Sequence, residues 1–167
     1  MKSKPLIRKA SAADAQSIFD LRIAAINSQC ADHYAAHDLA RWTKGTMTPQ
    51  FERMVMDKAH VAMVGGQVVA SGMVDLVSGQ IDAVFVQPEY MGQGVGRAIM
   101  QHLEQLAIAA GLRQLKLDST LNAAPFYRSL GFCGDAVASY CTSSSLPLDC
   151  IPMIKNLPVA ASQGASP

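Results

Sequence analysis

The strongest constraint on the fold of this chain is a glycine-rich loop between a predicted strand and a predicted helix. Apolar residues predict a strand over Ile81–Val86, which Pro88 ends. The loop Met91–Gly96 carries three glycines at alternate positions, and an amphipathic helix follows as far as Gly111. The first N–H groups of a helix lack intrahelical partners, and glycines let an anion approach the main chain closely. The segment therefore predicts an anion-binding site.

This loop matches neither of two common nucleotide-binding motifs. The Walker pattern G-x-x-x-x-G-K-[ST] is absent, and the spacing G-x-G-x-G differs from the dinucleotide fingerprint G-x-G-x-x-G. The strands before the loop form hairpins instead of a crossover unit, which also disfavours a dinucleotide-binding fold. On the loop alone, a turn that only connects strand to helix stays an open alternative.

The pattern around the loop predicts an α+β fold: a mostly antiparallel mixed sheet with a central parallel strand pair, flanked by helices. A Gly65-Gly66 turn predicts a hairpin of Ala59–Val64 with Gln67–Leu76. The unit Ile81–Leu117 reads strand–helix–strand, so its two strands should be parallel. The other predicted elements are a strand at Lys4–Lys9, a helix capped by Ser11 and ending near Ser28, helices at Ala36–Thr43, Pro49–Met56 and Asn122–Leu130, and strands at Ala136–Thr142 and Cys150–Lys155.

Composition narrows the class of protein. With 167 residues, of which 50% are hydrophobic and 16% charged, we expect one domain over residues 1–157 and a flexible tail over 158–167. Fourteen Lys and Arg against 13 Asp and Glu give a net charge of +1, which disfavours nucleic-acid binding by phosphate neutralisation. Without a signal peptide or an apolar run of ~20 residues, we expect a cytoplasmic protein with no membrane partner.

The four cysteines do not form a metal site by their spacing. Cys30, Cys133, Cys141 and Cys150 contain no C-x-x-C pair, so no zinc or other metal cofactor is predicted. We expect them to be small buried thiols and not disulfides.

Two blocks of the sequence together resemble the GNAT superfamily of acyl-CoA-dependent N-acyltransferases. The first runs from the strand Ile81–Val86 through Pro88-Glu89-Tyr90 and Gly92–Arg97 (GQGVGR) into the helix. The second is Asn122–Phe132 (NAAPFYRSLGF), which is similar to the family signature N-x-x-A-x-x-[FY]-Y-x-x-x-G-F. The two blocks have the family's order and separation, so the match is specific between Ile81 and Phe132.

The resemblance implies acetyl-CoA as the co-substrate. It implies that the main chain of Phe85 and Val86 pairs with the pantetheine arm and that the amides of Gln93–Arg97 hold the pyrophosphate. Asn122 would contact pantetheine, although an Asn here could also cap the next helix. Met91 stands where the family usually has Gln or Arg, so binding of the pyrophosphate would depend on the main-chain amides. Arg97 would add positive charge there, or, as the alternative, lie in solvent in the first turn of the helix. The expected cofactor-binding residues are Val84, Phe85, Val86, Met91, Gly92, Gln93, Gly94, Val95, Gly96, Arg97, Asn122 and Tyr127.

The same resemblance implies acetyl transfer to a primary amine by direct attack in a ternary complex. Tyr127 corresponds to the family's acid beside the sulfur, with a core tyrosine as the alternative. Asp82, on the strand that leads to the loop, is the candidate base, with an exposed strand-edge Asp as the alternative. A bulge at Val84–Val86 would free an N–H for the oxyanion.

The acceptor pocket is expected between the first two helices and the sheet. His33 and Tyr34 are its candidate residues, with a solvated loop as the plain alternative for His33, and Trp42 is expected to anchor its helix in the core. His37, His60 and His102 are expected at the surface. The acceptor is a small molecule or a peptide, and a homodimer stays open. A non-catalytic acyl-CoA-binding regulatory module on the same fold is the second hypothesis.

Overall fold

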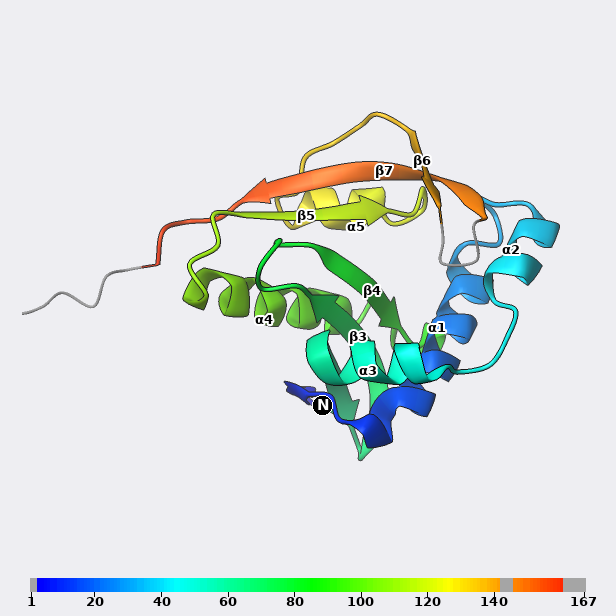
Figure 1. Ribbon diagram of the computed structural model, residues 1–167, viewed down its shortest axis with the longest axis horizontal. Helices are drawn as coiled ribbons and strands as arrows, with labels where there is room; N and C mark the ends of the chain where they lie inside the picture. Colours follow the sequence, from blue (N-terminus) through cyan, green and yellow to red (C-terminus); the bar gives the residue numbers. More distant parts are fainter. Residues whose placement is uncertain (1–2, 142–145, 161–167) are drawn as a thin grey trace, which may run out of the picture.

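The computed structural model describes residues 3–141 and 146–160, and these form two antiparallel sheets (Figure 1). The first sheet has the order β1-β2-β3-β4, and the second has the order β5-β7-β6. The strands are β1 (Leu6–Lys9), β2 (Ala59–Val64), β3 (Gln67–Val74), β4 (Ile81–Val86), β5 (Gln114–Ser119), β6 (Ala138–Cys141) and β7 (Pro147–Asn156). The fold class is the mixed α/β arrangement that the sequence predicts. The predicted tail falls largely on residues 161–167, which lie outside the described residues.

The hairpin of β2 and β3 follows directly from local sequence. Gly65 and Gly66 have φ angles of +57° and +79°, which a two-residue turn with the twist of a hairpin requires. Val64 pairs with Gln67 on either side of the turn. The predicted hairpin is therefore confirmed, with the bounds of β2 as expected.

The strands β4 and β5 run parallel but are joined only at their start. The bridge pairs Gln80 with Lys116, whose N–H donates to Gly79 O at 3.0 Å. Beyond this point the arrows of the two strands part toward α1 and α2 (Figure 1). The predicted central parallel pair therefore meets at this bridge and then diverges, an arrangement that we call the fork. It diverges because β4 forms its ladder with β3 and β5 forms its ladder with β7.

A bulge in β4 accompanies this fork, and it lies earlier than expected. Ala83 has a φ of +51°, and the pairing with β3 gains one residue between Asp82 and Phe85. The buried Ser71 Oγ donates to Ala83 O at 3.4 Å. The bulge therefore covers Ala83 and Val84, which overlaps the predicted segment Val84–Val86 at Val84 only, and Ser71 contacts the carbonyl of Ala83.

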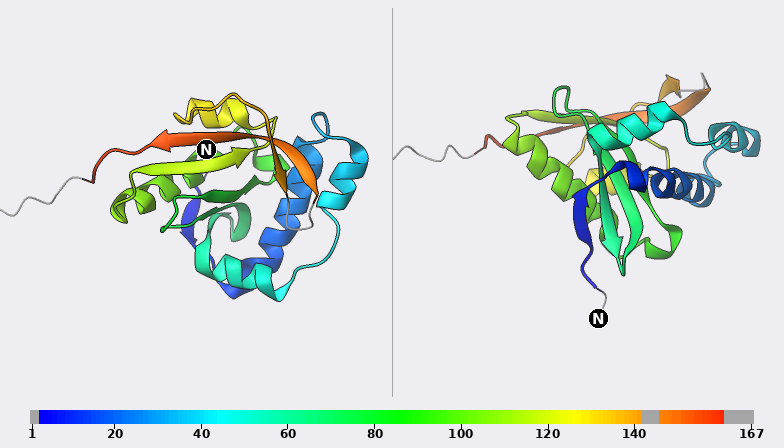
Figure 2. Two further views of the ribbon diagram at one scale, coloured as in Figure 1. Left: turned by 45° about the horizontal axis from the view of Figure 1, so that its top comes forward. Right: turned by 60° about the horizontal axis from the view of Figure 1, so that its bottom comes forward.

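Helices cover both faces of the first sheet, with α4 on one side and α1 and α3 on the other (Figure 2). Gly72 of β3 makes this possible, because a Cβ there would lie 2.8 Å from Ile99 Cγ2 and 2.9 Å from Leu103 Cδ1. The helices are α1 (Ala15–Gln29), α2 (Ala36–Trp42), α3 (Pro49–Lys58), α4 (Val95–Ala109) and α5 (Ala124–Ser129), with 3-10 turns η1 (Ala12–Asp14) and η2 (Pro88–Tyr90). None of the described helices is long and apolar enough to cross a membrane.

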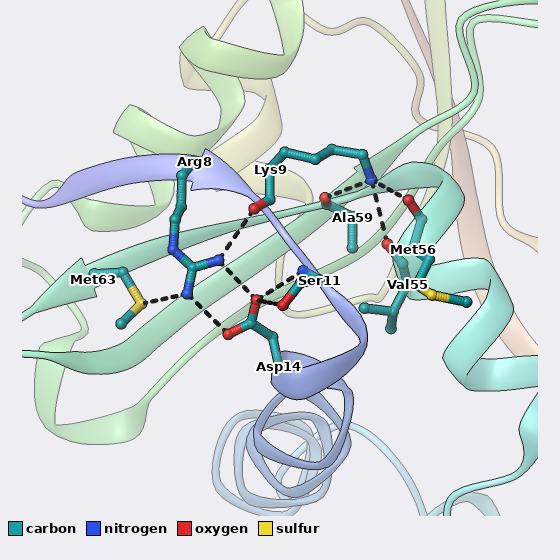
Figure 3. A network of polar contacts seen from close by, with 8 residues as sticks. All are labelled: Arg8, Lys9, Ser11, Asp14, Val55, Met56, Ala59 and Met63. Carbon is teal, nitrogen blue, oxygen red and sulfur yellow. Dashed lines mark hydrogen bonds and ion pairs between the residues drawn. The ribbon is translucent and has the colours of Figure 1, made fainter.

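The N-terminal corner joins β1 to α1 and α3 through charged groups (Figure 3). Arg8 donates to both carboxylate oxygens of Asp14, at 2.7 and 2.9 Å, and Ser11 N donates to the same carboxylate at 2.8 Å. The predicted Ser11 cap is therefore present. Lys9 Nζ donates to three carbonyls at the end of α3, the shortest contact being 2.6 Å to Met56 O. These contacts stabilise a helix C-terminus and hold the corner together.

Two predictions about exposure are wrong. His60 is only 8% exposed, because β2 is covered on both faces, and its ring lies 5.0 Å from that of His102 on α4. Burial lowers the pKa of His60 to about 4. Among the cysteines, Cys30 and Cys150 are buried free thiols as expected, but Cys133 is exposed where its main chain bridges to Ile154 at the sheet edge. The side chain of Cys141 lies outside the described residues.

Candidate functional site

The parting of β4 and β5 opens a cavity of about 500 Å³. Its walls come from α1, the end of α2, β4, β5, α5 and the start of β7, with one residue each from α3 and β3. Segments from the whole chain therefore meet at the one place where the sheet is interrupted. A cleft with apolar walls and a few polar groups is the usual form of a small-molecule site.

The edge of β4 that faces this cavity has main-chain groups free of strand pairing. Gln87 N donates to Val69 O at 2.8 Å, so alternation along the ladder directs the main chain of Phe85 to β3 and that of Val86 away from it. In agreement, Val86 O accepts a bond of 3.1 Å from Gln29 Nε2 of α1. Of the two predicted pantetheine contacts, Val86 thus presents its main chain to the side away from β3, whereas Phe85 is among the residues that line the cavity. Its neighbour Val84 also borders the cavity, but the Val84 side chain packs toward α4.

The glycine loop presents unpaired amides next to this edge. Gly92 and Gly94 have φ angles of +72° and +83°, and a Cβ on either would meet nothing within 4 Å. Within the described part of the chain, the main-chain N–H groups of residues 92–97 have no hydrogen-bond acceptor. Gly96 serves a different purpose, because a Cβ there would lie 3.3 Å from Phe126 Cζ. The loop is an open set of donors at the start of α4, which suits an anion.

The side chains of the loop contribute less than its amides. Met91 is 48% exposed, and Gln93 Nε2 donates to Glu89 O at 2.9 Å, which closes the loop on itself. Arg97 is exposed and makes no ion pair within the described residues. Its charge is therefore available beside the amides, although its position is also that of a solvated first-turn arginine.

Tyr127 lies at the inner wall of the cavity. It is 8% exposed, its ring packs edge-on against Phe126 and Phe132, and it belongs to the main core. Its hydroxyl makes no hydrogen bond to any described residue, although it lines the cavity. Burial raises the pKa of Tyr127 far above its ordinary value, and the Asp82 carboxylate raises it further. The phenol is therefore protonated at neutral pH, and the shift holds its proton more firmly than in an ordinary tyrosine.

Asp82 lines the same cavity and keeps part of its surface in solvent. Burial of the remainder raises its pKa above the ordinary value, against a hydrogen bond from Gln80 at 3.5 Å that lowers it. The Gln80–Lys116 bridge places Asp118 opposite Asp82, and this second carboxylate adds to the rise. Asp82 is thus an exposed residue of β4 that still faces the cavity, and a raised pKa suits a general base.

Asn122 does not cap α5, whose N-cap is Ala123. Asn122 Oδ1 is buried without a hydrogen-bond partner in the described part of the chain, and the residue lines the cavity. A buried amide oxygen without a partner is costly, so this group is suited to accept a bond from a ligand.

The predicted acceptor residues separate into two groups. His33 is exposed and does not line the cavity. Tyr34 lines it, but its hydroxyl donates to Asp149 O at 2.6 Å and accepts from Leu121 N at 3.1 Å, so it holds the loop after α1 against two later segments. Trp42 packs edge-on against Tyr34 with ring centres 5.7 Å apart, and it anchors α2 as expected while also lining the cavity.

Further polar residues of the cavity were missed from the sequence: Arg22, Gln29, Asp118, Thr120 and Asp149. Arg22 and Gln29 belong to α1, whose predicted apolar positions include Ile18 and Ile26. Arg22 is four residues from each of these, so it lies at the edge of the buried face. That spacing could have identified it. No comparable signal marked Asp118, which reaches the cavity only through the fork. Among the described residues, no group of three or more His, Cys, Asp or Glu side chains could hold a metal ion.

Comparison with known proteins gives a consistent result. A family model described as an acetyltransferase (GNAT) domain matches residues 30–142. The uncharacterized N-acetyltransferase YafP of Escherichia coli is 26% identical over 126 residues, which cover 75% of this chain and 79% of YafP. A GCN5-related N-acetyltransferase from Rhodopseudomonas palustris superposes with a TM-score of 0.86 at 25% identity, over 94% of this chain and 98% of that one. PaiA N-acetyltransferase from Thermoplasma acidophilum, solved with coenzyme A, shares the fold with a TM-score of 0.66 at 13% identity, over 92% and 99% of the two chains.

Proposed function

The chain belongs to the GNAT acetyltransferase family and is an acyl-CoA-dependent acetyltransferase, and on that basis we propose that it moves an acetyl group from acetyl-CoA to a primary amine. The acceptor is a small molecule or a peptide, and transfer is direct within a ternary complex. The observation that carries this proposal is Tyr127, a buried residue of the core whose hydroxyl makes no hydrogen bond to a described residue and which lines the same cavity as Asp82.

The proposed cofactor site runs from the glycine loop into the cavity. The amides of residues 92–97 receive the pyrophosphate, because they have no acceptor in the described part of the chain. The Val86 N–H, which is directed away from β3, and the amide of Asn122 receive the pantetheine arm, with the Val86 carbonyl held by Gln29. The complex of the structural neighbour PaiA with coenzyme A supports this choice of cofactor.

The proposed reaction is a sequence of proton and charge movements. Asp82, directly or through water, takes a proton from the acceptor ammonium, so that the neutral amine can attack the thioester carbonyl. An unpaired N–H of β4 stabilises the tetrahedral oxyanion. As the carbon–sulfur bond breaks, Tyr127 donates its proton to the CoA thiolate. The attacking nitrogen then loses its second proton, which returns to Tyr127 through water, and Asp82 releases the first proton to solvent. The products are the N-acetylated amine and CoA.

We place this reaction in one domain of residues 1–157, in a cytoplasmic protein without a nucleic-acid partner. A chain that ends at Leu157 should keep the turnover of the full chain, since Leu157 is the last buried residue of the described chain and its N–H donates to Arg113 O at 2.9 Å. Loss of turnover in that shortened chain would contradict the proposed domain boundary.

The test is acetyl transfer from acetyl-CoA to a panel of primary amines, followed through release of the CoA thiol. Calorimetry of CoA binding to the same preparation runs alongside it. We expect turnover with at least one class of amine and a CoA complex of 1:1 stoichiometry. CoA binding without transfer to any amine would instead support the non-catalytic module, which the named N-acetyltransferase relatives do not favour.

A further inference from the structure

Arg22 is the charged side chain of the cavity that lacks a counter-charge. It projects from the middle of α1, is half-buried and lines the cavity. No carboxylate within the described residues forms an ion pair with it. Burial lowers the pKa of Arg22, and no neighbouring acidic group opposes this effect.

The other charges of the cavity do not pose the same problem. Asp82, Asp118 and Asp149 are all exposed, so water solvates their carboxylates where no partner is present. A hydrated carboxylate without a partner costs little, whereas a desolvated guanidinium without one is expensive. Of the four charged side chains, Arg22 is therefore the one whose environment calls for a ligand of opposite charge.

A structural role accounts for only some of the N–H donors of the Arg22 guanidinium. One Nη of Arg22 donates to Trp42 O at 2.9 Å, the carbonyl of the last residue of α2, which is a normal way to stabilise a helix C-terminus. An arginine has five N–H donors in a fixed planar fork. The remaining donors have no acceptor among the described residues, and a fork of this kind matches a carboxylate or a phosphate.

The position of Arg22 separates it from the cofactor end of the cavity. Gln29, on the same helix, reaches the open main chain of Val86, which carries the proposed pantetheine contact. Arg22 lies seven residues earlier, or about 10 Å along the helix axis. It therefore lies toward the other end of the cavity, which we take as the acceptor side, and it contacts the main chain of Trp42 there. The apolar residues Met54 and Met73 also line the cavity.

We propose that the acceptor amine also carries an anionic group, a carboxylate or a phosphate, which Arg22 binds while the amine lies at Asp82. This inference rests on the proposed function. It narrows the acceptor from any primary amine to an amine with an acidic group, which amino acids and phosphorylated amines share.

The experiment uses pairs of acceptors that differ only in the anionic group. Alanine is compared with alaninamide, 5-aminopentanoate with pentylamine, and 2-aminoethyl phosphate with ethanolamine, so the carboxylate and phosphate arms are read separately. In at least one arm, kcat/KM of the anionic member should exceed that of its neutral partner by about tenfold or more. The proposal would be overturned if amines without an anionic group, including the dication 1,4-diaminobutane, were better acceptors than every anionic amine.

Variants of Arg22 test whether this residue carries the preference. In Arg22→Gln the ratio of kcat/KM within each pair should fall toward one, mainly through KM of the anionic member, and Arg22→Lys should restore part of it. The Kd of CoA and the Tm serve as controls for folding. An equal loss of kcat/KM for both members of every pair would mean a purely structural role and would overturn the proposal.

Binding without turnover separates this inference from the proposed function. Calorimetry with the CoA-loaded protein measures the Kd of the same acceptors directly. If the protein binds an anionic amine through Arg22 but never acetylates it, this result would contradict the proposed function and support the inference. If the CoA-loaded protein binds none of the anionic amines, the inference fails, whatever the enzyme acetylates. Should Arg22→Gln not fold, the comparison of paired acceptors on the unaltered protein still decides the question.

Discussion

The N-terminal corner and the cavity treat polar groups in opposite ways. In the corner, Arg8, Lys9 and Asp14 direct their charges at one another or at main-chain carbonyls (Figure 3). In the cavity, the Tyr127 hydroxyl and the Asn122 carbonyl oxygen are buried or nearly so and have no partner in the described chain. Since buried polar groups normally find partners, the corner is built for stability and the cavity leaves its groups for a ligand.

The comparison is sharpened by substitutions that should change activity in one region and stability in the other. Groups with satisfied hydrogen bonds should lower the free energy of unfolding when they are removed. Groups without partners should change turnover with little effect on unfolding.

The largest effect is expected from Tyr127→Phe. It removes the proposed proton donor, so kcat should fall about 100-fold or more. The Tm should stay the same or rise slightly, because the lost hydroxyl has no hydrogen bond to lose. Steady-state kinetics, calorimetry of CoA binding and thermal unfolding measure the three quantities.

Tyr34→Phe is the matched control, because it removes the hydroxyl of another cavity tyrosine that makes two hydrogen bonds. Here the free energy of unfolding should fall by about 1–2 kcal/mol, and kcat should change far less than in Tyr127→Phe. The same loss of kcat in both variants would remove Tyr127 from its special role.

Asp82→Asn should lower kcat/KM about 10- to 100-fold at neutral pH, as the loss of a general base would. In the unaltered enzyme kcat/KM should fall as pH drops through the raised pKa of Asp82, and this acidic limb should disappear in the variant. Asp118→Asn should shift the limb to lower pH, because the Asp118 charge raises the pKa of Asp82. Identical pH profiles for all three proteins would assign the base to another group.

Asp14→Asn tests the corner. The Arg8 hydrogen bond lowers the pKa of Asp14 to about 2, so the charged carboxylate stabilises the folded state above the unfolded pKa of 3.8. This stabilisation is lost as pH falls from 3.8 to about 2. At neutral pH the variant should lose about 1–2 kcal/mol, after allowance for the partly exposed Arg8. Turnover should be unaffected.

Urea unfolding at several pH values measures this loss. The exposed Arg128–Asp135 pair, 3.1 Å apart, supplies the control, because Asp135→Asn should change the free energy of unfolding by less than about 0.5 kcal/mol. Equal losses from the two substitutions would show that burial of Asp14 adds nothing.

The smallest effect is expected from His60→Gln and depends on pH. Folded His60 has a pKa lowered to about 4, so between about 6.5 and 4 the unfolded chain binds a proton that the folded chain does not. The unaltered protein should therefore lose stability as pH falls through that window, and the variant should lose less. The exposed His33, changed to Gln, should keep the full pH dependence of Tm. If both variants match the unaltered protein, burial of His60 has no thermodynamic consequence.

Local patterns predicted much of the fold. The paired glycines after Val64 need positive φ angles, so the turn and its two strands could be located from sequence alone. The Ser11 cap with Asp14 three residues later has the same local character. The strand, glycine loop and helix around Gly94 also depend on neighbours in sequence, which is why their bounds were predicted closely.

Long-range contacts account for what was not predicted. His60 is the one polar residue of the apolar strand β2, and the helix α4 packed against it makes it buried. The bulge lies at Ala83 and Val84, one residue earlier than predicted, in a pairing with β3 that local sequence does not specify. Arg22 was overlooked because α1 reads as an ordinary amphipathic helix until the fork of β4 and β5 opens beside it.

The sequence by itself determined the family, the anion-binding loop and the elements on either side of it, because turn chemistry and helix termini depend on a few adjacent residues. Only the tertiary structure decided which polar groups lack partners, since burial and pairing depend on segments far apart in the chain. It brought Tyr127, Asp82 and Arg22 to one cavity and left His33 outside it. The proposed choice of acceptor depends on these long-range contacts, because they determine which polar groups face the cavity.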